Sequence, residues 1–180
     1  MTRATTEKQP RANGTSDTNA VTFLTHQHDE VDVLLGKIEK ARSPEKKRAY
    51  FEELADKLAA HVAIEETLFY PAVKDAGSKI HDLVMESVEE HLAIKRVLAD
   101  LLALDVSHES FAPKLEVLKE EIEHHAREEE EKNLFPRVSK AFDEDELEQL
   151  GAKLADRYDH LMLHQPRLAV PAQTAEAAPV

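Results

Sequence analysis

The sequence contains no cysteine and no tryptophan, and only 4 of its 180 residues are glycine. Without cysteine the chain cannot form disulfides, thiolate-bound zinc or iron–sulfur sites, or a cysteine nucleophile. The few glycines provide no glycine-rich loop to hold a phosphate group. A β-sandwich or a doubly wound α/β fold would also need more turn residues than this. These absences favour an all-α domain.

Basic residues and long apolar runs are also scarce. The chain has 36 Asp and Glu against 23 Lys and Arg, a net charge of −13. Such a surface repels phosphate backbones and anionic lipids, so we expect no nucleic-acid partner and no membrane partner. No apolar run reaches the roughly 18 residues of a membrane-spanning helix. Because the first twenty residues lack the apolar core of a signal peptide, we expect a cytoplasmic protein.

Apolar residues with helical periodicity predict four long helices, over residues 21–41, 44–73, 79–104 and 111–141, and a fifth helix that begins at Asp143. Long helices joined by short loops are typical of an up-down-up-down four-helix bundle. Ser43 and Pro44 are typical of a helix start, and Asp143 with Glu146 forms a capping-box pattern. The predicted organisation is a disordered tail (1–20), the bundle (21–141), an accessory C-terminal helix (142–165) and a flexible tail (166–180).

The two halves of the predicted bundle resemble each other. The strings HVAIEETLFYP and HAREEEEKNLFP match, and equivalent positions lie 63 to 65 residues apart, as in the pairs His28 and His91, His61 and His125, and Pro71 and Pro136. This pattern indicates a duplicated helical hairpin. Equivalent residues are then expected to face each other across the bundle axis.

Each of the four long helices carries a histidine on its core-facing stripe: His28, His61, His91 and His125. Glu65 follows His61 by four residues and shares its face, and a glutamate follows His125 on the fourth helix. Burial of these groups without partners would cost several kcal/mol each. A cation removes that cost, because it neutralises carboxylates and accepts imidazole lone pairs. The pattern therefore predicts a buried metal site.

The types of ligand narrow the choice of metal. Imidazole and carboxylate without sulfur suit iron, manganese or zinc, and two similar halves favour two ions joined by bridging carboxylates. Histidines outnumber carboxylates here, unlike in the carboxylate-rich di-iron bundles. This balance favours two iron ions bridged by an oxo or hydroxo group, with an open position for a small ligand.

The motifs HDEVDVLL at His28, HVAIEETLFYP at His61, EEHLAIKRVL at His91 and HAREEEEKNLFP at His125 together resemble the hemerythrin family, specifically the bacterial hemerythrin-like HHE cation-binding domain, over about residues 21–140. The resemblance implies a four-helix bundle with a non-heme di-iron centre, and reactions with oxygen, nitric oxide or peroxide. It also implies the ligands His28, His61, Glu65, His91, His125 and one glutamate of the fourth helix.

Two positions depart from or complicate that pattern. Oxygen-carrying hemerythrins have a second histidine where this chain has Lys95, so a water, a tyrosine or a glutamate has to replace an imidazole. This departure argues against reversible oxygen carriage and favours redox turnover. The glutamate of the fourth helix is either Glu129, four residues after His125, or Glu130, five residues after it. We favour Glu130, which a local π-bulge would bring into register.

Several further residues have alternative interpretations. Lys95 either extends to solvent or donates to an anion or peroxide near the metals. His26 is an alternative to His28, and His124 is likewise the neighbour of His125. His81 and His108 are predicted to be exposed. The pair His160 and His164 has the spacing of a metal site, but the solvent-facing interpretation is favoured. Glu66 is expected to face solvent or to hydrogen-bond a ligand. The sequence does not place Tyr70 or Tyr158 relative to the metals.

The functional expectation is a redox enzyme that removes peroxide or nitric oxide, with an electron donor that the sequence does not identify. A second interpretation is a module that binds, senses or stores oxygen, nitric oxide or iron without turnover. A third is a structural zinc bundle.

Overall fold

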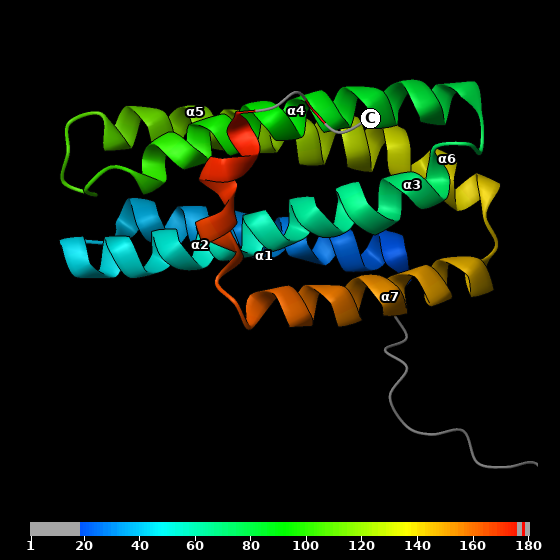
Figure 1. Cartoon of the computed structure of the whole chain (residues 1–180), viewed down its shortest axis with the longest axis horizontal. Coiled ribbons are helices and arrows are strands. Elements are labelled where there is room, and N and C mark those ends of the chain that lie inside the picture. Colours follow the sequence, from blue (N-terminus) through cyan, green and yellow to red (C-terminus); the bar gives the residue numbers. More distant parts are fainter. Residues whose placement is uncertain (1–18, 176–177, 179–180) are drawn as a thin grey trace, which may run out of the picture.

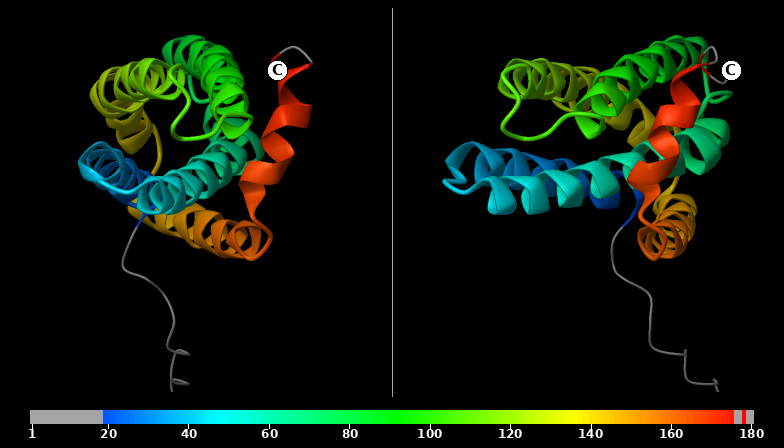
Figure 2. Two further views of the ribbon diagram at one scale, coloured as in Figure 1. Left: turned by 90° about the vertical axis from the view of Figure 1, so that its left-hand side faces the viewer. Right: turned by 60° about the vertical axis from the view of Figure 1, so that its left-hand side comes forward.

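The computed structural model describes residues 19–175 and 178, which include four helical rods packed side by side (Figure 1). Two rods are single helices, α1 (Ala20–Lys40) and α4 (Ser78–Leu102). The second rod consists of α2 (Pro44–Ile64), η1 (Glu65–Phe69) and α3 (Tyr70–Val73), and the fourth of α5 (Phe111–Glu123), η2 (His124–Leu134) and α6 (Phe135–Ala141). The predicted all-α four-helix bundle is confirmed, and Figure 2 shows the rods surrounding a common centre.

The predicted helix boundaries agree with the structure to within two residues, because the caps that the sequence indicated are formed. The Ser43 side chain accepts a hydrogen bond from the Lys46 N–H at the start of α2. Asp143 and Glu146 form a reciprocal capping box at the start of α7 (Glu144–Met162). Both caps satisfy N–H groups that would otherwise lack partners at the helix ends.

Two apolar clusters fill the bundle on either side of a polar layer. One cluster includes Phe51 and Phe111, whose rings meet edge to face with centroids 5.1 Å apart. The other includes Phe69 and Phe135, with centroids 5.8 Å apart. The four histidines lie between these clusters along every rod. The clusters therefore shield the histidine layer from water at both ends of the bundle.

The C-terminal part covers the outside of the bundle. Helix α7 packs against α1 and α2, as Figure 1 shows. We predicted a flexible tail from residue 166, but Pro166–Thr174 form the 3₁₀ helix η3, which contacts α2 and α4. Val170 is buried there, and the Arg167 backbone N–H donates to Asp56 Oδ1 at 3.1 Å. The buried Val170 side chain and the ion pairs of Arg167 with Asp56 and Glu52 thus anchor a segment whose Pro and Ala content indicated no structure.

The predicted N-terminal tail lies outside the described residues except for Asn19 and Ala20. These two residues belong to the bundle, since Asn19 caps α1 through a bond from the Thr22 N–H and Ala20 is fully buried. Among the described residues, no helix is both long and apolar enough to cross a membrane.

Candidate metal centre

The four predicted histidines converge in one buried layer. His28 comes from α1, His61 from α2, His91 from α4 and His125 from η2, and none is more than 4% exposed. Glu65 and Glu130 lie in the same layer and are 0% exposed. The structure therefore brings together one histidine from each rod and one glutamate from each hairpin. We name these six residues the His/Glu cluster.

The cluster divides into two groups that share Glu65. In the first group, His28, His61, Glu65 and Glu130 each offer a ligand atom within 4.8 Å of the others; Glu65, His91 and His125 form the second group. His61 Nε2 lies 3.1 Å from Glu65 Oε2, and His91 Nε2 lies 3.3 Å from the same oxygen. Glu65 is thus the carboxylate that the two groups have in common.

Several polar atoms of the cluster have no hydrogen-bond partner among the described residues. They are His28 Nε2, His61 Nε2, both carboxylate oxygens of Glu65, and Glu130 Oε2. His28 Nε2 is only 3.2 Å from Glu130 Oε2, but the two atoms do not meet in a hydrogen-bonding direction. Each such buried atom costs roughly 1–3 kcal/mol. A cation among them would satisfy all of them together, so the donor set fits a metal.

The π-helix η2 sets the register of Glu130. The widened turns of η2 span His124–Leu134 and close with a bond from the Phe135 N–H to the Glu130 carbonyl. A π-turn places the residue at i+5, rather than i+4, on the same face. Glu130 accordingly enters the cluster, whereas Glu129 is half-buried outside it and accepts a bond from Asn133. Of the two alternatives, the structure brings Glu130 to the histidines.

Each histidine also makes a hydrogen bond through its other ring nitrogen, Nδ1. The partners are Glu131 for His28 (2.8 Å), Gln27 for His61 (2.8 Å), Glu66 for His91 (3.2 Å) and Glu90 for His125 (2.8 Å). A ring that donates its Nδ1–H directs the lone pair of Nε2 into the cluster. All four rings are thus held in the orientation that a metal ligand requires.

Lys95 points away from the predicted metal positions. Its side chain is 6% exposed, and Nζ donates to both carboxylate oxygens of Glu66 at 2.6 and 2.7 Å. The expectation that Lys95 reaches solvent is therefore wrong in this structure, and donation to a bound anion stays a prediction. Glu66 holds the ammonium group instead and also accepts a hydrogen bond from His91.

Tyr70 is the residue of the site that the sequence did not place. Its side chain is 2% exposed, its hydroxyl donates to Glu130 Oε1 at 3.0 Å, and the hydroxyl oxygen lies 3.3 Å from His91 Nε2. Burial, Glu130 and Glu65 raise the pKa of Tyr70 well above its ordinary value. The phenol therefore lies beside the second group, next to His91 Nε2.

The internal repeat of the sequence points to Tyr70 as a residue near the cluster. Tyr70 and Phe135 both precede the matched prolines and both lie against the first histidine of the opposite hairpin. The ring of Tyr70 is 5.4 Å from that of His91, and the ring of Phe135 is 5.9 Å from that of His28. The internal repeat thus predicts that an aromatic ring at this position contacts the cluster.

The remaining histidines are exposed and outside the cluster: His26, His81, His108, His124, His160 and His164. His124 contacts Glu90 and Glu128, and His164 Nδ1 bonds to the His160 carbonyl at 3.0 Å. Tyr158 packs against Phe23 and not against the cluster. None of these residues joins the two groups above.

Burial controls the charge of the cluster. Burial and then His125 lower the pKa of His91 to about 4, and burial and then His28 lower the pKa of His61 well below its ordinary value. Both rings are neutral at pH 7, with lone pairs available to a cation. His28 differs, because Glu130 and Glu131 outweigh its burial and raise its pKa. Burial and then Glu130 raise the pKa of Glu65.

We expect the free energy of unfolding of the metal-free protein to fall as the pH decreases from 6.5 to about 4. In this window the unfolded chain binds a proton at His91 that the folded chain does not, since burial lowers the pKa of His91 from 6.5 to about 4. This shift corresponds to about 3 kcal/mol. His61, whose pKa is also lowered, adds to this loss of stability. Glu65 has a raised pKa, so the folded chain binds its proton first, and this stabilises the folded state as the pH falls towards 4.5.

Urea unfolding of the wild type and of His91→Gln at pH 6.5 and 4.5 measures this contribution. The variant is expected to lose less stability than the wild type over this interval. Equal losses in the two proteins would contradict the assigned charge of His91.

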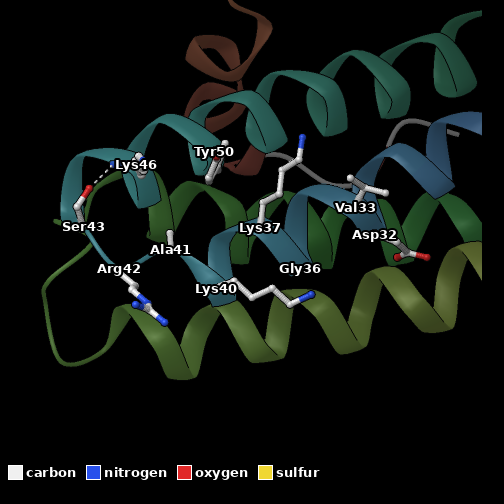
Figure 3. Close-up of a pocket in the computed structure, with 10 residues that line it drawn as sticks. All are labelled: Asp32, Val33, Gly36, Lys37, Lys40, Ala41, Arg42, Ser43, Lys46 and Tyr50. Carbon is white, nitrogen blue, oxygen red and sulfur yellow. Dashed lines mark hydrogen bonds between the residues drawn. The ribbon is translucent and has the colours of Figure 1, made fainter.

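A wide groove of about 680 Å³ lies between the end of α1 and the start of α2 and shares no residue with the cluster. It is lined in part by Lys37, Lys40, Arg42 and Lys46, and in Figure 3 the ends of Lys37, Lys40 and Arg42 point in different directions. Lys37 and Lys40 lie in the last turn of α1, where positive charge offsets the helix dipole. Helix stabilisation accounts for Lys37 and Lys40, and the basic side chains do not converge on one point, so we assign no site to the groove.

Known proteins that resemble this chain match the region that forms the bundle. The family profile of the hemerythrin HHE cation-binding domain matches residues 19–138. The uncharacterized protein Rv2633c of Mycobacterium tuberculosis is 30% identical over 145 residues, which cover 79% of this chain and 87% of that protein. A DNA nickase from Nostoc sp. is 26% identical over 133 residues, which cover 74% of this chain but only 37% of the nickase.

A solved structure shows the same fold. The Rv2633c homolog from Mycobacterium kansasii, a hemerythrin HHE cation-binding domain-containing protein, aligns with a TM-score of 0.72 at 29% identity. The alignment covers 85% of this chain and 97% of the homolog.

Proposed function

The chain belongs to the hemerythrin HHE cation-binding domain family, and on this premise we propose that the His/Glu cluster holds two iron ions that react with small oxidants. Peroxide and nitric oxide are the favoured substrates, oxygen is a further ligand, and an external donor supplies electrons. The observation that carries the proposal is the set of buried ring nitrogens and carboxylate oxygens without hydrogen-bond partners among the described residues.

The two groups divide the ligands between the ions. His28, His61, Glu65 and Glu130 would hold the first ion, and His91, His125 and the shared Glu65 would hold the second. Tyr70 is next to the second group and is the favoured replacement for the missing imidazole. Nitrogen and oxygen ligands without sulfur suit iron. A bound iron pair supplies the one-electron chemistry that amino-acid side chains lack.

The surroundings of the cluster favour a small substrate. A void of about 10 Å³ adjoins it, close to the volume that one water molecule needs. His28, His61 and His125 line this void together with apolar side chains from all four rods: Val31, Leu58, Val62, Ile94, Ile122 and Ala126. The two apolar clusters exclude bulk water, and the Tyr70 hydroxyl is placed to hold or donate a proton beside Glu130. Such a pocket suits diatomic molecules and peroxide.

Turnover by the iron-loaded protein tests this function. We expect consumption of peroxide, or of nitric oxide together with peroxide, to fall more than about 100-fold in His61→Ala, because a ligand is lost. His26→Ala is the matched control, since His26 is exposed outside the cluster. If the iron-loaded wild type binds oxygen or nitric oxide reversibly without turnover, the protein is a sensing or storage module and not an enzyme. A protein isolated with zinc alone would indicate a structural bundle.

A further inference from the structure

The hydrogen bonds to the outer ring nitrogens follow the duplication of the chain. Glu66 bonds His91 in one half, and the equivalent Glu131 bonds His28 in the other. Glu90 bonds His125 at 2.8 Å, and the residue equivalent to Glu90 is Gln27, which bonds His61 at 2.8 Å. Three rings therefore donate to a carboxylate, and only His61 donates to a neutral amide.

A second difference between the halves is the aromatic residue that lies against the first histidine of the opposite hairpin. Tyr70, with an ionisable hydroxyl, lies against His91, whereas its equivalent Phe135 lies against His28. The Tyr70 phenol is neutral, because burial and the neighbouring carboxylates raise its pKa. The difference in charge between the halves therefore comes from Glu90 beside His125 and Gln27 beside His61. Gln27 is only 6% exposed, so its hydrogen bond to His61 is sheltered from water.

The identity of the Nδ1 partner affects how strongly a ring binds metal. A carboxylate acceptor draws the Nδ1 proton towards itself and makes Nε2 a stronger donor, whereas an amide oxygen does so less. Fixed negative charge also favours the higher charge state of a nearby ion. The two metal positions of one duplicated site are therefore chemically unequal.

We propose that Gln27 is a positioning residue that makes the two metal positions different, so that the ion held by His28 and His61 is bound more loosely than it would be with a carboxylate in place of Gln27. The inference rests on the proposed two-ion site. Gln27 acts through His61 and does not itself touch the metal.

Cobalt(II) added to the metal-free protein tests this inference without iron or turnover. Competition with a chelator gives the two binding constants, and His61→Ala and His125→Ala identify which constant belongs to which position. We expect Gln27→Glu to raise the affinity of the His28 and His61 position about tenfold and to leave the other constant within twofold. The mirror variant Glu90→Gln is expected to lower the affinity of the His91 and His125 position by a similar factor.

The gain of affinity separates this role from a structural one, because a variant that only disturbs the fold would weaken binding. In the iron-loaded protein, Gln27→Glu is expected to shift the one-electron reduction at the His28 and His61 position about tenfold towards the oxidised form. Two ions bound with both constants unchanged in Gln27→Glu would overturn the inference and leave the proposed function intact. Fewer than two cobalt ions bound to the wild type would overturn both.

Discussion

Replacement of Glu65 by glutamine is expected to abolish the binding of both ions, with affinities more than about 100-fold below those of the wild type. Replacement of a residue that hydrogen-bonds a ligand already lowers metal affinity about 10- to 100-fold. Glu65 is itself a predicted ligand and is the one residue common to both groups. The metal-free variant is expected to be as stable as the metal-free wild type or more stable. A neutral amide is cheaper to bury than a carboxylate, and the repulsion from Glu130 disappears.

Metal titration and urea unfolding of the same preparations measure both effects. Glu129→Gln is the matched control, because Glu129 lies outside the cluster and should bind metal as the wild type does. A Glu65→Gln protein that retains one tightly bound ion would contradict the bridging position of Glu65.

Replacement of Tyr70 by phenylalanine is expected to lower the turnover of peroxide about 100-fold while two ions remain bound. The hydroxyl is the only part removed, and its loss takes away the donor to Glu130 and the oxygen 3.3 Å from His91 Nε2. A positioned proton donor contributes roughly 10²- to 10⁴-fold. If the phenol ligates iron, the variant also loses the visible absorption of a ferric phenolate.

Tyr158→Phe is the control for this experiment. Its hydroxyl is also buried and has no hydrogen-bond partner among the described residues, but its ring packs against Phe23 away from the cluster. Turnover and absorption should not change in Tyr158→Phe. Equal turnover by Tyr70→Phe and the wild type would remove Tyr70 from the chemistry.

Helical periodicity predicted the rods because each rod has one buried stripe, and the four histidines interrupt those stripes at repeated positions. The duplication predicted a histidine on every rod, but the rings that meet are those within one hairpin, His28 with His61 and His91 with His125, and not the equivalent pairs. The proposed π-bulge explained how Glu130 could enter the cluster, and η2 has this geometry. These predictions depend on local spacing, which the sequence contains directly.

Other features depend on tertiary contacts that periodicity does not contain. The direction of the Lys95 ammonium depends on Glu66 of a different rod. The packing of η3 depends on Val170 and on Asp56, which lies 111 residues from Arg167. The partners of Tyr70 lie on two other rods, so its role became visible only when the rods were assembled.

The measurement that tests the central claim most directly is diffraction at the iron absorption edge from crystals of the protein as isolated. We predict two anomalous peaks per chain, one between His28 and His61 and one between His91 and His125, with Glu65 bordering both. A single peak, or peaks at the zinc edge alone, would contradict the proposed iron pair. Histidine rings that point away from one another around an empty or water-filled space would contradict the metal centre itself.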